Sequence, residues 1–231
     1  MIPLRDENPS HSVPVVTRSL IAINAAMFLY ELALGPGLRD FMLQWGEVPA
    51  RVTLAFHFRE EPITPVALTF LSSMFLHGGW AHLLGNMWYL WIFGDNVEDR
   101  LGAVRYFLFY LLAGVIAALA HWLTNPGSRL PTVGASGAIA GVLGAYAVAF
   151  PRARVVTLVP LFPFFQVVAL PALLVLGLWF VFQFFSGALS LGYGAGGGVA
   201  WWAHIGGFAF GALTMKAFGR PRRRLEAWQD E

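Results

Sequence analysis

A single hydroxyl opens an apolar segment in the second half of the chain. Ser136 lies between Gly134 and Gly137 in the run PTVGASGAIAGVLGAY, residues 131–146. A serine hydroxyl is a weak nucleophile unless a neighbouring base accepts its proton, and the imidazole of histidine suits that task near neutral pH. Small residues are also common where membrane helices pack closely, so Ser136 taken alone could equally be a packing residue.

Three further polar residues lie inside apolar stretches. His82 and Asn86 occur in HGGWAHLLGNMWYLW, and His204 occurs in WWAHIGGFAFGAL. Polar groups at membrane depth are costly and indicate function by default. With a rise of 1.5 Å per residue, His82, Ser136 and His204 each lie about 18–22 Å from the end of their own span, so they reach a similar level. Asn86 follows His82 by four residues and shares its helix face.

The composition of the chain indicates that these residues lie on membrane-spanning segments. Of its 231 residues, 57% are hydrophobic and only 12% are charged, whereas a soluble domain carries about 25% charged residues. The chain is therefore a membrane protein, and the absence of cysteine excludes disulfide and thiolate chemistry. Apolar stretches near the length of about 20 residues that crosses a bilayer occur at 18–35, 70–94, 103–123, 134–150, 165–187 and 200–218.

The distribution of Lys and Arg orients these six predicted spans. Most of these residues lie on the side that would hold both ends of the chain, so the positive-inside rule predicts cytoplasmic termini and a plasma-membrane location. Residues 1–17 become a cytoplasmic segment that does not resemble a cleaved signal peptide, and 219–231 become a basic cytoplasmic tail. The 36–69 segment becomes a large outer loop, and the glycine-rich 192–198 run becomes an outer turn.

The fourth span is short, which predicts a recessed cavity. A helix that starts at Ser136 leaves the preceding PTVGA as irregular backbone at membrane depth. Such backbone is tolerated only where it is buried in protein or lines a water-filled cavity. We therefore expect Ser136 to lie on the floor of a cavity.

Two pairs of glycines predict how this serine meets a base. Gly137 and Gly141 form a GxxxG pair in the fourth span, and Gly207 and Gly211 form another in the sixth. Such pairs let helix backbones approach closely in lipid. Because Gly207 shares a helix face with His204, packing of the two spans could bring the imidazole within hydrogen-bonding distance of the Ser136 hydroxyl.

Acyl transfer by Ser136 also requires donors for the developing oxyanion. The Ser136 amide at a helix N-terminus, the Asn86 amide group and the His82 ring could supply them. No Asp or Glu lies at matching depth to orient His204, so the sequence predicts a Ser–His dyad.

Other kinds of site remain open on the residues alone. A metal site could use His77, His82 and His204, but the chain has no HExxH pair. A lipase-type GxSxG elbow fails because Ala138 occupies its fifth position. A channel or transporter is consistent with six spans, and Asn86 could serve as polar glue between helices. We expect no metal and no cofactor.

The motifs, taken in order, resemble the rhomboid family of intramembrane serine proteases over residues 18–218. The resemblance implies an all-α membrane protein, a six-transmembrane-helix bundle with a recessed active-site cavity. It implies Ser136, in GASG, as nucleophile and His204 as base. It implies His82 and Asn86 as oxyanion stabilisers.

The resemblance also implies structural roles for several motif residues. Glu98, in GDNVEDRLG, would bind loop amides or hydroxyls. The remaining motif positions are glycines: Gly134, Gly137, Gly207 and Gly211.

This chain departs from the family pattern at two places. No counterpart of a Trp-Arg pair common in the first outer loop occurs in 36–69. Many members also carry an aromatic residue four positions after the serine, stacked on the catalytic histidine, and here that position is Ala140. We therefore expect other neighbours, such as Trp201 and Trp202, to hold His204.

The expected function is that of a serine-type endopeptidase that cleaves transmembrane proteins near the outer membrane face. Its partners would be transmembrane substrates and membrane lipid, without nucleic acid. The alternative is a non-proteolytic rhomboid-like binding or quality-control protein, although such relatives typically lack the serine or the histidine. We expect the fifth span, 165–187, to be the door for substrates, because it lacks a small-residue seam and contains Pro171.

Overall fold

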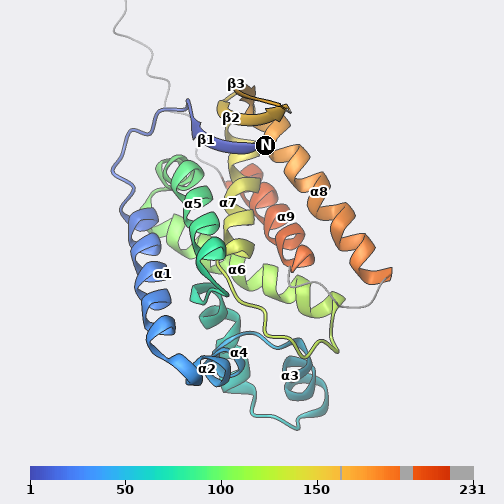
Figure 1. Cartoon of the computed structure of the whole chain (residues 1–231). Helices are drawn as coiled ribbons and strands as arrows, with labels where there is room; N and C mark the ends of the chain where they lie inside the picture. Colours follow the sequence, from blue (N-terminus) through green and yellow to red (C-terminus); the bar gives the residue numbers. More distant parts are fainter. Residues whose placement is uncertain (162, 193–199, 219–231) are drawn as a thin grey trace, which may run out of the picture.

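The structure is a computed structural model that describes residues 1–161, 163–192 and 200–218. Helices form most of it, and a small sheet covers one end (Figure 1). The helices are α1 (Val15–Ala33), α2 (Leu38–Trp45), α3 (Pro49–Thr53), α4 (Ile63–Ser72), α5 (Trp80–Leu101), α6 (Ala103–Thr124), α7 (Ser136–Ala149), α8 (Ala172–Gly192) and α9 (Trp201–Phe218). The strands are β1 (Ile2–Asp6), β2 (Arg154–Leu161) and β3 (Phe164–Pro171).

Helix α7 lies at the centre of the bundle, surrounded by α5, α6 and α9 (Figure 1). Almost every residue of this helix from Gly137 to Ala147 is buried. Its sequence is apolar on all sides, and a helix of that kind is stable only where neighbours cover its whole surface. The helix that carries Ser136 is therefore the most enclosed element of the fold.

Glycines set the distance between α7 and α9. A Cβ atom added at Gly207 would collide with the carbonyl oxygen of Gly137, and one added at Gly211 would collide with the carbonyl oxygen of Gly141. On another side of α7, a Cβ at Gly137 would lie 2.6 Å from the Cβ of Ala117 on α6. The two predicted glycine pairs thus meet each other, and the backbones of α7 and α9 are in direct contact.

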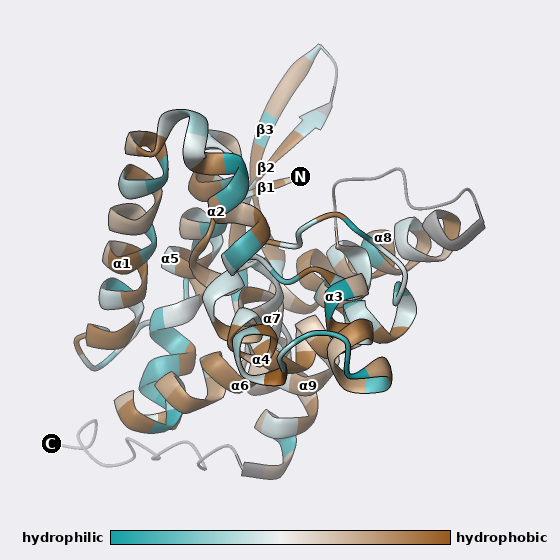
Figure 2. Cartoon of the chain, turned by 90° about the horizontal axis from the view of Figure 1, so that it is seen from below, coloured by the Kyte–Doolittle hydropathy of each residue, from teal (hydrophilic) through white to brown (hydrophobic). Residues whose placement is uncertain are grey.

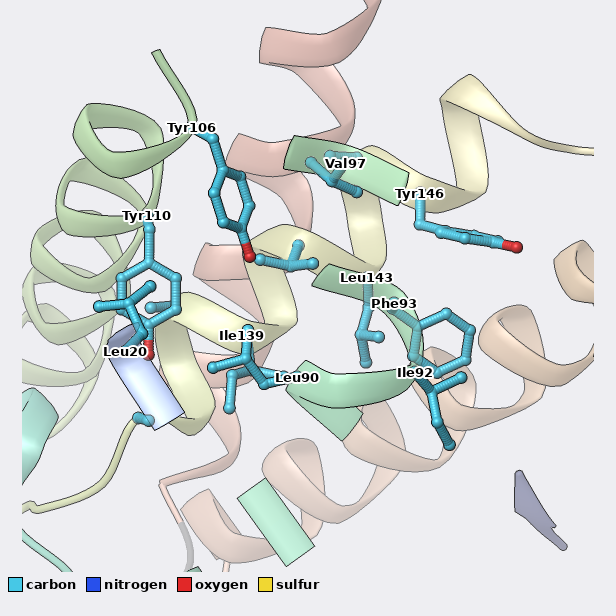
Figure 3. Packing of buried hydrophobic residues seen from close by; sticks show 14 of the residues in the cluster. Leu20, Leu90, Ile92, Phe93, Val97, Tyr106, Tyr110, Ile139, Leu143 and Tyr146 are labelled. Carbon is cyan, nitrogen blue, oxygen red and sulfur yellow. The ribbon is translucent and has the colours of Figure 1, made fainter. Parts of the chain in front are cut away.

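Aromatic and aliphatic side chains pack together around α7 (Figure 3). Phe93 of α5 packs edge-on against Tyr146 of α7, with ring centroids 5.0 Å apart. Tyr106 and Tyr110 of α6 are fully buried in the same cluster. Burying such large rings helps to hold α5 and α6 to the central helix.

Three of the described helices are long and apolar enough to cross a membrane: α1, α6 and the Ala172–Leu189 part of α8. Two apolar helical segments are shorter, Ile63–Phe75 and Ser136–Ala149. Many large apolar side chains are exposed in the described part of the chain. Hydrophobic residues recur along most of its helices (Figure 2). The surface is that of a membrane protein.

The expectation of an all-α fold with a fifth span at 165–187 is wrong in one part. Strands β2 (154–161) and β3 (164–171) pair antiparallel, and β1 pairs with β2 to complete a sheet of order β1-β2-β3. Pro171 is the last residue of β3, and α8 begins only at Ala172. An unbroken apolar run does not distinguish a strand from a helix, which explains the error.

Two further segments, 36–69 and 70–94, also differ from expectation. The predicted outer loop 36–69 contains α2, α3 and the first part of α4. The predicted second span 70–94 is divided, because α4 and a short 3-10 turn end at Phe75 and α5 begins at Trp80. The 192–198 turn after Gly192 and the 219–231 tail lie outside the described residues.

Candidate active site

The backbone just before Ser136 is irregular and is held by protein groups on both sides. Thr132 exchanges two backbone hydrogen bonds with Glu47, of 3.1 and 2.7 Å. The Gly134 amide donates to the carbonyl oxygen of Ser73 at 2.9 Å. Helix α7 then begins at Ser136, the residue at which the sequence predicted its start. These bonds satisfy backbone groups that lipid could not.

Gly134 lets two polar side chains approach this segment. It has a φ of +123°, which side-chain-bearing residues rarely adopt. A Cβ atom there would lie 2.6 Å from Nε2 of His82 and 3.6 Å from Nδ2 of Asn86. Both groups therefore lie directly beside the residue that is two positions before Ser136.

Ser136 and His204 are joined by a hydrogen bond. The Nε2 atom of His204 lies 2.7 Å from the Oγ atom of Ser136. The serine starts α7 and the histidine lies in the first turn of α9, three residues before Gly207. The close contact of the two glycine pairs aligns the helices at the depth where these side chains meet.

The other ring nitrogen of His204 has a partner that the sequence analysis missed. Nδ1 lies 2.7 Å from Oε1 of Gln183 on α8. Both side chains are buried, with Gln183 6% and His204 9% exposed. The signal was present in the sequence, because Gln183 is the one amide side chain among residues 172–192.

Aromatic rings from two helices surround the imidazole. Trp179 of α8 lies with its ring centroid 5.8 Å from that of His204, and Trp201 of α9 lies edge-on at 6.4 Å. Trp202, also expected near His204, contacts Phe184 instead. Ala140 is buried against α9, with its Cβ 3.4 Å from the position that a Cβ on Gly207 would take, so the helix contact leaves no room for an aromatic ring there.

His82 and Asn86 both have hydrogen-bond donors beside Gly134, two residues before the serine. The Nδ1 atom of His82 accepts a hydrogen bond from the Gly78 amide at 3.3 Å, which leaves the proton of a neutral ring on Nε2. Asn86 is buried, and its Nδ2 atom has no hydrogen-bond partner. A buried donor without a partner is costly, so it indicates a place where a ligand oxygen binds.

Glu98 acts at a distance from this site. Its carboxylate is buried and accepts hydrogen bonds from the amides of Val16 and Thr17, at 2.9 and 2.8 Å, and from the Thr17 hydroxyl at 2.8 Å. The first turn of a helix leaves such amides without partners, and a carboxylate there also complements the helix dipole. Glu98 therefore joins the end of α5 to the start of α1.

A metal centre finds no support in the described part of the chain, which holds no group of three or more His, Asp and Glu side chains suited to an ion. His77 and His82 lie with ring centroids 5.2 Å apart, whereas His204 is bonded to Ser136 and Gln183. The three histidines do not converge on one point as the metal hypothesis required.

Comparison with known proteins identifies the family to which this arrangement belongs. Residues 65–221 match the Rhomboid domain, which is more than half of the chain. The chain belongs to the rhomboid family. The matched rhomboid region contains Ser136, His204, His82, Asn86 and Glu98.

Individual relatives extend the match. The chain is 32% identical over 224 residues to the mitochondrial Rhomboid protein 1 of Saccharomyces cerevisiae, covering 90% of this chain and 56% of that protein. It is 31% identical over 174 residues to the mitochondrial presenilin-associated rhomboid-like protein of Bos taurus, covering 72% and 42%. It is 41% identical over 78 residues to the chloroplastic Rhomboid-like protein 11 of Arabidopsis thaliana, covering 34% and 28%. The chain thus spans from about a quarter to just over half of the length of these relatives.

These relatives correct the predicted location. The plasma-membrane assignment with cytoplasmic termini is wrong, because the relatives that match most of the chain are mitochondrial rhomboid proteins. The distribution of Lys and Arg distinguishes the two sides of a membrane but does not identify the membrane. The plasma membrane therefore could not be inferred from the positions of Lys and Arg.

Proposed function

We propose that this rhomboid protein is a serine endopeptidase that cleaves transmembrane proteins within the membrane, with a six-span bundle as its catalytic domain. The observation that carries the proposal is the 2.7 Å separation between Nε2 of His204 and Oγ of Ser136. A base at that distance can accept the hydroxyl proton as the oxygen attacks a peptide carbonyl.

The reaction would proceed through two steps. Oγ of Ser136 forms a bond to the carbonyl carbon while His204 takes its proton, and the collapse of this intermediate breaks the peptide bond as His204 protonates the leaving amine. Water, deprotonated by His204, then attacks the acyl-enzyme, and His204 returns that proton to Oγ of Ser136 as the ester bond breaks and the carboxylic acid product leaves.

The oxyanion of both steps needs fixed donors. The unpartnered Nδ2 group of Asn86 and the Nε2–H group of His82 support this role, because both lie beside Gly134, which precedes the serine by two residues. The Ser136 amide, at the start of α7, is a third donor.

The substrate would be a membrane-spanning protein with a weakly helical segment near the membrane surface, since a backbone carbonyl must leave its helix before it can be attacked. Helix α8 lies at one edge of the bundle (Figure 1) and presents apolar side chains to the outside. Such an edge suits lateral entry from lipid.

The experiment is cleavage of a fluorescent transmembrane substrate in liposomes, together with labelling by a fluorophosphonate probe. We expect Ser136→Ala to lose both cleavage and labelling, while the control Ser19→Ala, at an exposed serine, keeps both. His204→Ala should be as inactive as Ser136→Ala, and the double variant no worse than either, because the two groups act as a unit. Cleavage at the wild-type rate by Ser136→Ala would overturn the proposal, and a folded wild-type chain that neither cleaves nor labels would favour a binding role.

A further inference from the structure

The contact between His204 and Gln183 has chemical consequences beyond a serine–histidine pair. A side-chain amide oxygen only accepts hydrogen bonds, so an Nδ1 atom 2.7 Å from Oε1 of Gln183 must carry a hydrogen. In a neutral imidazole the other nitrogen is then bare. Nε2, which faces Oγ of Ser136 at 2.7 Å, is therefore in the form that can accept the serine proton.

Gln183 belongs to a stripe of buried and half-buried residues on α8. Ala172, Leu176, Trp179, Gln183 and Gly187 recur at intervals of three or four residues, and these residues lie on the face of α8 turned toward the bundle. Gln183 is the amide in this otherwise apolar and small-residue stripe, and its one described hydrogen bond goes to His204. Burying an amide costs free energy unless it is hydrogen-bonded, so an apolar residue would serve packing alone better.

We propose that Gln183 is a positioning residue that completes a Ser136–His204–Gln183 relay. Its amide oxygen holds Nδ1–H of His204, fixes the reactive tautomer and stops the ring from turning away from Ser136. The inference rests on the proposed function, since it assigns a role within the same site.

Because Gln183 lies on α8, its bond to His204 depends on how α8 packs against the rest of the bundle. Ser136 and His204 lie on α7 and α9, which are in direct backbone contact, whereas Gln183 lies on α8 at the edge of the bundle. The relay is therefore complete only while α8 packs against α9. Outward movement of α8 to admit a substrate would remove the orienting bond, and its return would restore the base.

Two substitutions and a matched control test the role of the amide. In Gln183→Leu, of similar size but without an acceptor, we expect kcat to fall roughly 10- to 100-fold with KM within about threefold of wild type. Gln183→Glu keeps an acceptor oxygen and should recover most of the loss. Phe185→Leu, at a side chain 62% exposed on the same helix, should leave kcat unchanged.

A spectroscopic measurement tests the same inference without relying on activity. Nitrogen NMR of histidine-labelled protein, with the His204 signals assigned by their loss in His204→Ala, should show Nδ1 protonated and Nε2 bare in wild type. In Gln183→Leu the two tautomers should both be populated. A wild-type His204 protonated at Nε2 would overturn the inference, as would a Gln183→Leu variant with wild-type kcat.

Different results would overturn the protease proposal and the role of Gln183. If wild type cleaves nothing but shows the Nδ1–H tautomer, and Gln183→Leu loses it, the relay stands and the protease proposal falls. If Ser136→Ala abolishes cleavage but Gln183→Leu changes neither kcat nor tautomer, the protease proposal stands and the relay falls.

Discussion

Gly211 of α9 packs directly on the carbonyl oxygen of Gly141 of α7, with no space for a Cβ atom between them. We predict that Gly211→Ala separates the two helices and lowers the melting temperature by roughly 5 °C, since overpacking a tight contact costs about 1–3 kcal/mol. The control is Gly177→Ala on α8, where an added Cβ meets nothing within 4 Å. Equal melting temperatures for the two variants in the same detergent would contradict the tight contact.

The oxyanion assignment predicts a specific kinetic pattern. Asn86→Ala and His82→Ala should each lower kcat, by up to about 10²–10³ for a well-placed donor and by less where the other donors compensate. KM should change little, because the oxyanion exists only along the reaction path. The check is steady-state cleavage in liposomes, and wild-type kcat in both variants would remove these residues from the site.

Gly134 should tolerate no side chain. Gly134→Ala would place a methyl group against the ring of His82 at a φ of +123°. We expect a loss of activity of at least about tenfold, because the strained backbone and the displaced ring both move groups beside Ser136. Gly85→Ala, where an added Cβ meets nothing within 4 Å, is the matched control on α5 and should remain active.

Glu98 should matter for stability rather than for chemistry. Glu98→Gln loses a charged acceptor for three hydrogen bonds, which should destabilise the protein by about 2–3 kcal/mol. Asp99→Asn, one residue later at an exposed site that accepts from Ser12, should cost under about 1 kcal/mol. Thermal unfolding followed by circular dichroism measures both, and a smaller loss for Glu98→Gln than for Asp99→Asn would contradict the assignment.

Glu47 should make stability depend on pH. Burial raises the pKa of this carboxyl, which lies between α2 and α3, from 4.5 to about 8 in the folded protein. The folded state therefore keeps a proton that the unfolded state releases, so stability is greatest below pH 4.5 and falls as the pH rises toward 8. Between about pH 5 and pH 8 we expect the melting temperature to decrease by at least about 3 °C. In Glu47→Gln this part of the pH dependence should disappear.

If substrates enter beside α8, two neighbouring aromatic residues of this helix should have different effects on cleavage. Phe180 of α8 packs on Phe208 of α9 with ring centroids 4.7 Å apart, whereas Trp179 lies against both Phe208 and His204. We predict that Phe180→Val loosens α8 and speeds cleavage of a transmembrane substrate, while Trp179→Val slows cleavage because it also removes a wall of the histidine pocket. Hydrolysis rates of a transmembrane and a short soluble substrate separate entry from chemistry.

Much of the site could be predicted because depth and spacing determine it. The rise per residue placed Ser136 and His204 at one level, and the two glycine pairs predicted the contact that the structure has between α7 and α9. The start of α7 at Ser136 followed from the length of that span. The depth of a residue, the spacing of glycines and the start of a helix all depend on residues close together in the sequence, so they can be predicted from it.

Contacts between distant elements were harder to predict. Gln183 was not predicted because a carboxylate was the expected partner for His204, although an amide buried among apolar residues also indicates a hydrogen-bonding role. The sheet was missed because helices α1 to α7 lie between β1 and β2 in the sequence. Pairing between strands so distant along the chain leaves no periodic pattern in the sequence. The three helices within 36–69 are short, and short helices depend on tertiary packing more than on propensity.

The sheet has a consequence for the order in which the molecule assembles. Ile2 pairs with Leu158, Pro3 accepts a hydrogen bond from Trp88, and Asp6 accepts one from Tyr146, so the first strand depends on partners from three later parts of the chain. The last of these partners, in β2, is synthesised only after α7. Contacts between residues so distant along the chain also form late in folding. The start of the chain is thus among the last segments to be fixed, and its protection from proteolysis during synthesis would report that the bundle beneath it has closed.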